Sequence, residues 1–563
     1  MGTPYVDVVE KREQAMQEPE KGDESLEIEM DGPNLKRTLT SRQISMFSIA
    51  GSIGTGLLIS TGSALAAGGP GSMLIAFTVV GFLCYNVLAA YGEMSTAFPM
   101  DKSFSGYAAR FVDPAYGLKK KWERAATGFN YFCKYSVLLA NNLTASGLIM
   151  QYWLPHVNVG VWIATFAIPI ICINLCPVKV FGEVEFAASI IKTIVIVGLM
   201  LTCLVIDLGG GPDGGRIGFR YWSSPGAFNT HLLPGATGSF LGWWTCMVDA
   251  SFVYMGTELV GVAFGETQKP WKVIPNAIRQ TAWRIGFLYV GGVLILGMVV
   301  PYNSHGLLTA TKTSTSAGAS PFIVAIKEAG IKTLPGLVNG SLLVFVLSAA
   351  SSDIYTSSRT LYGLAKDGYM PSIFKRTYWS VPIPAVAFSS LFLLLALLST
   401  TEQSSIVFHD LVSLATVFGL FNWMSVLISY ILLRRGMEAQ NIPHNTMPFK
   451  ERWMEARAWV TLISVATIIL FSGVANFIPK FQVKTFVFAY IAIPIHLLFI
   501  FGSKLLLRSK QVDLLSMDLY TGRITAEDKE RAEMADREQL EAIGSDVSFI
   551  DRFRALVKRY GAH

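Results

Sequence analysis

The chain is a series of long apolar runs separated by shorter polar segments. Each run holds about 20 residues, which is enough for an α-helix to cross the roughly 30 Å of hydrocarbon in a bilayer. We therefore predict an all-α polytopic membrane protein with twelve transmembrane helices. The predicted spans are residues 45–66, 72–98, 125–152, 157–177, 184–206, 240–264, 283–301, 335–363, 383–400, 407–433, 459–478 and 484–506.

The segments outside these spans are polar. Residues 1–40 are rich in acidic side chains and lack the apolar stretch of a secretory signal, so we predict a disordered tail. Residues 41–506 form the predicted transmembrane domain. Residues 507–563 form a charged C-terminal tail, with a helix predicted near 526–542.

Two spans are interrupted by glycine. Residues 44–62 of span 1 read ISMFSIAGSIGTGLLISTG, and residues 250–267 of span 6 read ASFVYMGTELVGVAFGET. Glycine inside a helix costs about 1 kcal/mol relative to alanine, so each cluster requires a reason. Two reasons are possible: the glycines allow close packing of helices, or the helix is broken at mid-membrane around a polar cavity.

The spacing of these two spans favours the broken helix. They lie five spans apart, as expected for an inverted repeat with its binding site at the repeat interface. The first repeat is then 45–206 and the second 240–433, with spans 11 and 12 at 459–506 outside both.

Composition and charge agree with a membrane protein. The sequence is 52% hydrophobic and 15% charged, whereas soluble proteins have about 25% charged residues. Lys and Arg gather in the segments after spans 2, 6, 8 and 10, while those after spans 1, 3 and 9 are nearly free of them. By the positive-inside rule both tails face the cytosol. The net charge of +6 therefore reflects membrane topology, and no nucleic-acid partner is expected.

The sequence offers no sign of catalysis. Its six cysteines lie in apolar spans without a metal-ligand pattern or a disulfide framework. No nucleophile–base pair and no phosphate loop is visible in the sequence. We expect no enzyme activity, no cofactor and no metal site.

Several stretches resemble a known family, the fungal amino acid permeases, or yeast amino acid transporter family, of the amino acid–polyamine–organocation superfamily. They include SIAGSIGTGLLISTG (48–62), GEMSTAFP (92–99), GTELVGVAFGET (256–267) and SSDIYTSSRTLYGLAKDGYMP (351–371). KTFVFAYIAIP (484–494) and DLYTGR (518–523) look most like the dicarboxylic members.

The resemblance implies a LeuT-type fold, with spans 1–5 and 6–10 as inverted repeats, spans 1 and 6 broken, and two peripheral helices. It also implies proton-coupled import of amino acids at the plasma membrane, with glutamate and aspartate as candidate substrates. A broad-range or neutral amino acid permease and a non-transporting amino acid sensor on the same fold are the alternatives. Ubiquitin-ligase machinery is a candidate partner at the tails, where Lys11, Lys21 and Lys36 are candidate acceptors.

One stretch departs from the family. Residues 118–124, LKKKWER, fall where span 3 is expected to begin. Either the cytosolic loop is longer and span 3 starts near Ala125, or the stretch is an artefact of gene prediction such as a retained intron.

The substrate, a zwitterion, needs a partner for each charge. In a LeuT-type fold the backbone N–H groups of broken span 1 attract the carboxylate, and carbonyls at the half-helix ends accept from the ammonium. Phe252 and Tyr254 are candidate lids, or ordinary packing residues. The expected carboxylate site is Gly51, Ser52, Ile53, Gly54, Thr55 and Gly56, and the expected carbonyl site is Ser48, Ile49, Phe252 and Met255, with Gly256 between the half-helices of span 6.

Three ionisable residues inside spans are functional candidates, since charges are costly in hydrocarbon. Glu258 is predicted to couple transport to protons, with a structural alternative as an acceptor at a helix end. The resemblance implies the same coupling role for Lys192, by its position in the family motif. Lys134 is predicted to neutralise the extra carboxylate of an acidic substrate. Its alternative is to extend along span 3 to the cytosolic surface.

Overall fold

A computed structural model describes the chain at residues 54, 56–100, 103–112, 125–212, 215–262, 269–312, 320–379, 381–400, 404–507 and 512–534. All of these belong to the second of two units, 1–38 and 39–563. Three predicted features therefore lie outside the described residues: the N-terminal tail, the start of span 1 and the insertion at 118–124.

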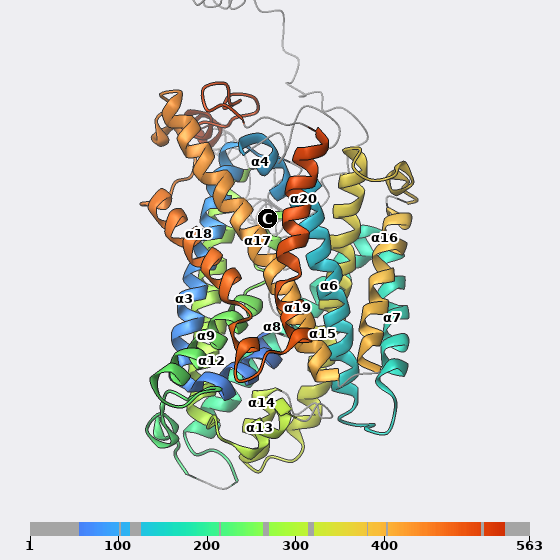
Figure 1. Cartoon of the computed structure of the whole chain (residues 1–563), viewed down its shortest axis with the longest axis vertical. Coiled ribbons are helices and arrows are strands. Elements are labelled where there is room, and N and C mark those ends of the chain that lie inside the picture. Colours follow the sequence, from blue (N-terminus) through green and yellow to red (C-terminus); the bar gives the residue numbers. More distant parts are fainter. Residues whose placement is uncertain are drawn as a thin grey trace, which may run out of the picture. The chain divides into compact units, whose positions relative to one another are not determined.

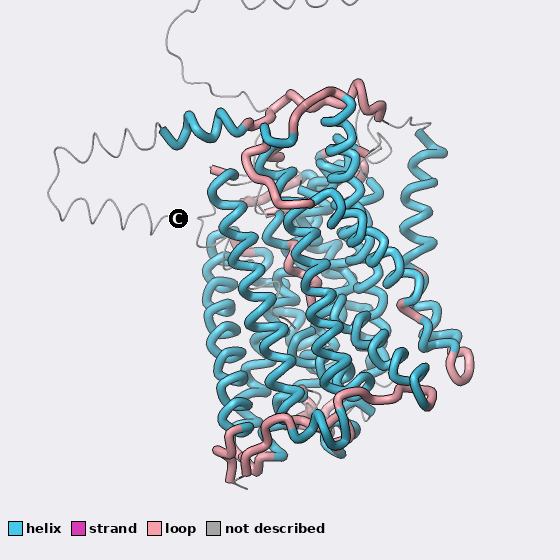
Figure 2. The backbone as a smooth tube through the Cα atoms, turned by 90° about the vertical axis from the view of Figure 1, so that its left-hand side faces the viewer, coloured by secondary structure: helices cyan, strands magenta, loops and turns pink. Residues whose placement is uncertain are grey.

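The described part of the chain is built of helices and contains no strand. Figures 1 and 2 show these helices running side by side, with loops gathered at their two ends. The longer helices are α3 (Thr61–Ala97), α6 (Ala125–Met150), α7 (Val159–Leu175), α8 (Val178–Asp207), α9 (Gly235–Val253), α15 (Leu334–Lys366), α17 (Ser404–Ala439), α18 (Met454–Phe471) and α20 (Ala492–Leu507). The shorter ones are α4 (Ser103–Phe111), α10 (Leu259–Val262), α11 (Pro270–Arg284), α12 (Gly292–Val299), α13 (His305–Lys312), α14 (Pro321–Glu328), α16 (Ile383–Ser390) and α19 (Val483–Tyr490).

Every predicted span includes at least part of one of these helices. Among the described residues, eight helical segments are long and apolar enough to cross a membrane. Spans 1 and 2 form a single run from Gly56 to Ala97, kinked at Gly69, where φ is +79°. The all-helical membrane architecture is confirmed, while the count of twelve spans stays a prediction.

The helices place apolar side chains outward and many polar ones inward. Large apolar residues such as Ile194, Ile463 and Leu498 are each more than 60% exposed on the faces of α8, α18 and α20. Asn130 and Asn141 on α6, in contrast, are fully buried. This distribution suits a lipid environment, where exposed apolar faces carry no penalty and polar groups must find partners inside the protein.

Small residues bring α3 and α9 together. A Cβ added at Gly242 of α9 would lie 2.8 Å from the carbonyl oxygen of Ala67 and 3.1 Å from Cα of Gly68. Both atoms belong to the backbone, which cannot turn aside as a side chain can. Gly242 therefore sets the distance between the two helices, as small residues do at membrane helix interfaces.

We expect Gly242→Val to lower thermal stability and the amount of protein at the cell surface. The valine side chain would force α3 and α9 apart, and overpacking of a tight interface costs about 1–3 kcal/mol. Gly198→Val is the matched control, because nothing lies within 4 Å of a Cβ added at Gly198 of α8. Fluorescence-detected size-exclusion chromatography after heating measures both variants. Equal melting temperatures would contradict the assignment.

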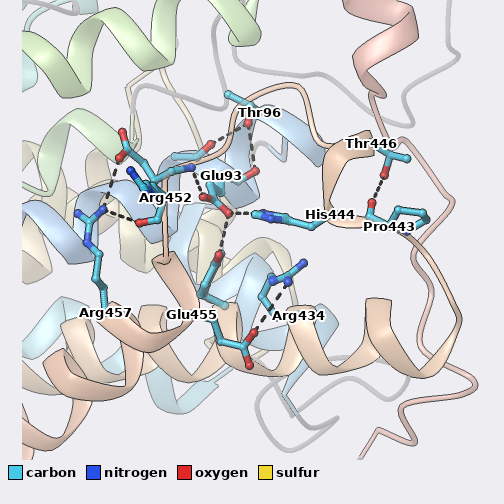
Figure 3. A network of polar contacts seen from close by, with 12 residues as sticks. Glu93, Thr96, Arg434, Pro443, His444, Thr446, Arg452, Glu455 and Arg457 are labelled. Atoms are coloured by element: carbon cyan, nitrogen blue, oxygen red, sulfur yellow. Dashed lines mark hydrogen bonds and ion pairs between the residues drawn. The ribbon is translucent and has the colours of Figure 1, made fainter.

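A buried carboxylate ties the end of α3 to α17 and to the following loop (Figure 3). Glu93 is fully buried and accepts a hydrogen bond from the hydroxyl of Tyr430 at 2.7 Å. It also accepts from the backbone N–H of Glu451 at 2.6 Å, and Nε2 of His444 lies 3.1 Å away. These partners give Glu93 a structural role at this end of the bundle.

Part of the predicted C-terminal tail packs onto the same end. We call residues 512–525 the C-terminal strap. The guanidinium of Arg110 on α4 donates to the carbonyl oxygens of Asp518 at 3.1 Å and Thr521 at 2.6 Å. The N–H of Ile524 donates to the carbonyl of Ala97 at 2.8 Å. Gln440, just past α17, donates to the carbonyls of Leu514 and Met517 at 3.1 and 2.7 Å.

Candidate functional site

The break predicted in span 6 is present in the structure. Helix α9 ends at Val253 and α10 begins at Leu259. Gly256, between them, has φ +96°, a conformation that side chains other than glycine rarely adopt. The matching break in span 1 stays a prediction, because Ser48, Ile49, Gly51, Ser52, Ile53 and Thr55 lie outside the described residues.

A cavity opens beside the broken segment of span 6. Its lining comes from the start of the described part of span 1, from α6, from the end of α9 with the broken segment, and from α15. The lining residues are Gly54, Gly56, Tyr135, Leu138, Asn142, Phe252, Val253, Met255, Gly256, Ala349, Ser352 and Asp353. Five of the predicted binding residues are therefore brought together here: Gly54, Gly56, Phe252, Met255 and Gly256.

Two glycines of span 1 differ in the space around them. A Cβ at Gly56 would lie 2.9 Å from Cα of Val253, a backbone atom of α9. A Cβ at Gly54 would have only Cβ of Ala349 nearby, at 3.9 Å, which is ordinary contact. Gly56 thus permits the close approach of spans 1 and 6, whereas Gly54 faces α15 across the cavity.

Lys134 and Glu258 form an ion pair next to the cavity. The Nζ atom of Lys134 on α6 contacts Oε1 of Glu258 in the broken segment, and both side chains are buried. The second oxygen of Glu258 accepts from the backbone N–H of Gly256 at 3.0 Å. Glu258 thus also satisfies a backbone group left free by the break. Lys134 points to this pair and not along span 3 to the surface.

Lys192 belongs to a second buried pair. It lies 3.8 Å from Oε1 of Glu185, two helical turns earlier on α8, and the hydroxyl of Ser348 on α15 donates to the same oxygen at 2.6 Å. Lys192 is fully buried and does not line the cavity. The spacing of seven residues places Glu185 and Lys192 on one helix face, so this pairing was visible in the sequence.

Tyr254, a candidate lid or packing residue by its sequence, makes packing contacts in the structure. Its hydroxyl donates to the carbonyl of Phe77 at 2.9 Å, and its ring stacks on Tyr289 with centroids 4.9 Å apart. These contacts turn it toward α3 and away from the cavity lining. Of the two candidate lids, Phe252 is the one that lines the cavity.

Sequence reasoning missed Asp353, the charged residue of the cavity lining. It lies on α15, and its side chain is buried. Nδ2 of Asn142 donates to Oδ2 of Asp353 at 2.7 Å. A carboxylate in the middle of an apolar span is itself a signal of function. Asp353 was considered only as part of the SSDIYTSSRT stretch that carries the family resemblance, and not as a residue with a role of its own.

The described part of the chain contains no group of three or more His, Cys, Asp or Glu residues that could hold a metal ion. The cavity offers backbone at a broken helix, one carboxyl group, the hydroxyls of Tyr135 and Ser352, and the amide of Asn142. The buried ion pair of Lys134 and Glu258 lies beside it. These are groups that can match the charges of a small zwitterion.

Comparison with known proteins identifies a solved structure of similar fold and relatives of similar sequence. A manganese transporter of Eremococcus coleocola has the same fold, with a TM-score of 0.50 and 12% identity over 86% of this chain and 98% of that one. An uncharacterized amino-acid permease of Schizosaccharomyces pombe is 45% identical over 87% of this chain and 92% of its own length. The dicarboxylic amino acid permease of Saccharomyces cerevisiae is 40% identical over 93% of this chain and 86% of its own length.

These relatives are permeases and not enzymes, as expected. The family match extends over residues 43–516, from the start of span 1 into the C-terminal strap. The chain therefore belongs to the amino acid permease family, whose members are multi-pass membrane transporters.

Proposed function

We propose that the chain is a proton-coupled symporter that imports acidic amino acids across the plasma membrane. In this proposal twelve spans form a LeuT-type 5+5 inverted repeat with spans 1 and 6 broken, and spans 11 and 12 are peripheral. Both tails, 1–40 and 507–563, lie in the cytosol, where ubiquitin-ligase machinery acts on tail lysines. The observation that carries the proposal is the buried pair of Lys134 and Glu258 beside the cavity.

The pair explains how an anionic substrate and a proton travel together. A glutamate or aspartate brings one more negative charge than a neutral amino acid, and an unpaired carboxylate is costly in the protein interior. The substrate side chain takes the place of Glu258 on the ammonium of Lys134. Glu258, displaced, takes up a proton. The local charge is then the same with and without substrate, because one carboxylate and one proton enter together.

The α-carboxylate of the substrate is assigned to the span 1 side of the cavity. Gly54 and Gly56 line the cavity there, and the first helical residues after the predicted break present free backbone N–H groups. Lys192 is the second proposed coupling residue. Its pairing with Glu185 and the bond from Ser348 connect α8 to α15, so a change of charge at Lys192 acts on a helix that lines the cavity.

The likeness to the dicarboxylic amino acid permease of Saccharomyces cerevisiae supports the acidic substrate class. The experiment is radiolabelled uptake in a permease-deficient host, with the common amino acids as unlabelled competitors. We expect glutamate and aspartate to compete best, uptake to be faster at acidic external pH, and a protonophore to abolish accumulation.

Three results would contradict the proposal in different ways. Equal competition by neutral and acidic amino acids would favour the broad-range permease. Protein at the cell surface without uptake of any amino acid would favour the sensor. Accumulation that persists in the presence of the protonophore would exclude proton coupling while leaving the substrate class standing.

A further inference from the structure

Asp353 is the one charged side chain in the lining of the cavity, among the residues that the structure describes. It extends from α15 opposite the broken segment of span 6. Its hydrogen-bond partner in the described part of the chain is the neutral amide of Asn142. Asn142 thus satisfies one oxygen of the carboxyl group, and the carboxyl group lines the cavity.

The other buried charges near Asp353 have nearer partners of their own. Lys134, Lys192 and Glu185 are close enough to act on it electrostatically. However, Lys134 contacts Glu258, and Lys192 lies 3.8 Å from Glu185. None of the ion pairs among the described residues includes Asp353. With each of these lysines matched by a carboxylate, Asp353 has no ion-pair partner of its own among the described residues.

A buried carboxylate without an ion-pair partner is stabilised by a cation that enters the cavity beside it. The substrate of an amino acid permease carries such a cation, its α-ammonium group. An ammonium has three donors, whereas Asp353 still has an unoccupied oxygen, so a charge-assisted hydrogen bond can form between them.

We propose that Asp353 recognises the α-ammonium group of the substrate and makes the carrier selective for free amino acids over acids that lack the amine. This inference rests on the proposed transport function and deepens it. The ammonium would bridge Asp353 and the backbone carbonyls of the broken segment, because Phe252, Met255 and Asp353 line the same cavity.

The full assignment leaves no substrate charge unmatched. The α-carboxylate faces the span 1 backbone, the ammonium faces Asp353, and the side-chain carboxylate faces Lys134. The three partners come from three elements that meet at the cavity, namely span 1, α15 and α6. A neutral amino acid would use the first two partners and leave the Lys134–Glu258 pair undisturbed.

The test compares glutamate with glutarate, which is glutamate with the amine replaced by hydrogen. Both are used as competitors of labelled glutamate uptake at one fixed external pH. The wild-type carrier should prefer glutamate by at least about tenfold, which corresponds to 1.4 kcal/mol. In Asp353→Asn the KM for glutamate should rise on the order of 100-fold, as when one partner of a buried charge pair is removed. The preference over glutarate should collapse toward one.

Asp249→Asn is the matched control. Asp249 is another carboxylate within a predicted span, it accepts from the hydroxyl of Ser63 at 3.1 Å, and it is not part of the cavity lining. Its neutral variant should keep the wild-type preference for glutamate over glutarate. Asp353→Ser is made beside Asp353→Asn, so that a folding failure of one neutral variant does not remove the test.

The outcomes separate this inference from the proposed function. If no amino acid is transported, the proposed function fails. If glutamate is transported and a neutral variant of Asp353 at the cell surface keeps the preference over glutarate, only the role of Asp353 fails. Wild-type protein that accepts glutarate as well as glutamate would overturn that role without any variant. If another amino acid proves the best substrate, the same comparison is made with that amino acid and its des-amino analogue in place of glutamate and glutarate.

Discussion

Replacing Gly56 by alanine should lower uptake more than about tenfold while the protein still reaches the cell surface. The new methyl group would lie 2.9 Å from Cα of Val253 and 3.4 Å from the side chains of Phe252 and Val253. Real Cβ atoms do not approach backbone this closely, so spans 1 and 6 must move apart. That movement displaces Phe252 and the broken segment from the cavity, and we expect uptake to fall by more than about tenfold, the equivalent of 1.4 kcal/mol.

Gly54→Ala is the control, because its methyl group would meet only Cβ of Ala349, at an ordinary 3.9 Å. We expect it to keep most of the uptake. Gly54→Val, with a branched side chain reaching into the cavity, should lose uptake although its first methyl position is tolerated. Surface biotinylation normalises all three variants. Similar uptake by Gly56→Ala and Gly54→Ala would show that the approach of spans 1 and 6 does not govern transport.

The second large effect is expected at the Lys134–Glu258 pair. Changing either residue alone to glutamine leaves the other charge buried without its partner, which costs about 3–5 kcal/mol. We expect both Lys134→Gln and Glu258→Gln to lower the melting temperature and to lose accumulation of substrate. In surviving Lys134→Gln protein, glutamate uptake should fall far more than uptake of a neutral amino acid.

The double variant, with glutamine at both positions, separates stability from coupling. Two neutral amides can hydrogen-bond to each other, so much of the lost stability should return, as a double-mutant cycle would reveal. Proton-driven accumulation should not return, since no group of the pair can take up a proton. Single variants as stable as the wild type would refute the stabilising role of the Lys134–Glu258 pair. A double variant that accumulates glutamate would refute its role in proton coupling.

The helices themselves were largely predictable, since length and apolarity decide which segments can cross a bilayer. Each predicted interval contains helix. The strap was not foreseen. Its buried contacts are made by single residues such as Leu519 within a charged tail, and its backbone bonds to α4 and to the end of α3 leave no periodic pattern in the sequence.

The lining of the candidate site was predictable where it depends on the backbone and not where it depends on side-chain partners. Glycine marks an unwound segment, so Gly54, Gly56 and Gly256 were found. The direction of a side chain depends on the neighbouring helices, so the packing of Tyr254 against Phe77 and Tyr289 could not be predicted. Lys134 and Glu258 were each functional candidates in the sequence, but only the fold shows that they form a pair. Only the fold shows, likewise, that Asp353 lines the cavity.

The C-terminal strap also bears on how the molecule is made. Its partners Ala97, Arg110 and Gln440 are all translated before it. A nascent chain can insert every span and still leave these donors and acceptors unmet at one end. Docking of the strap through polar contacts is therefore a late step of assembly that follows membrane insertion. A chain that ends before residue 512 leaves the polar groups at this end of the bundle without their partners, where cellular quality control can recognise them.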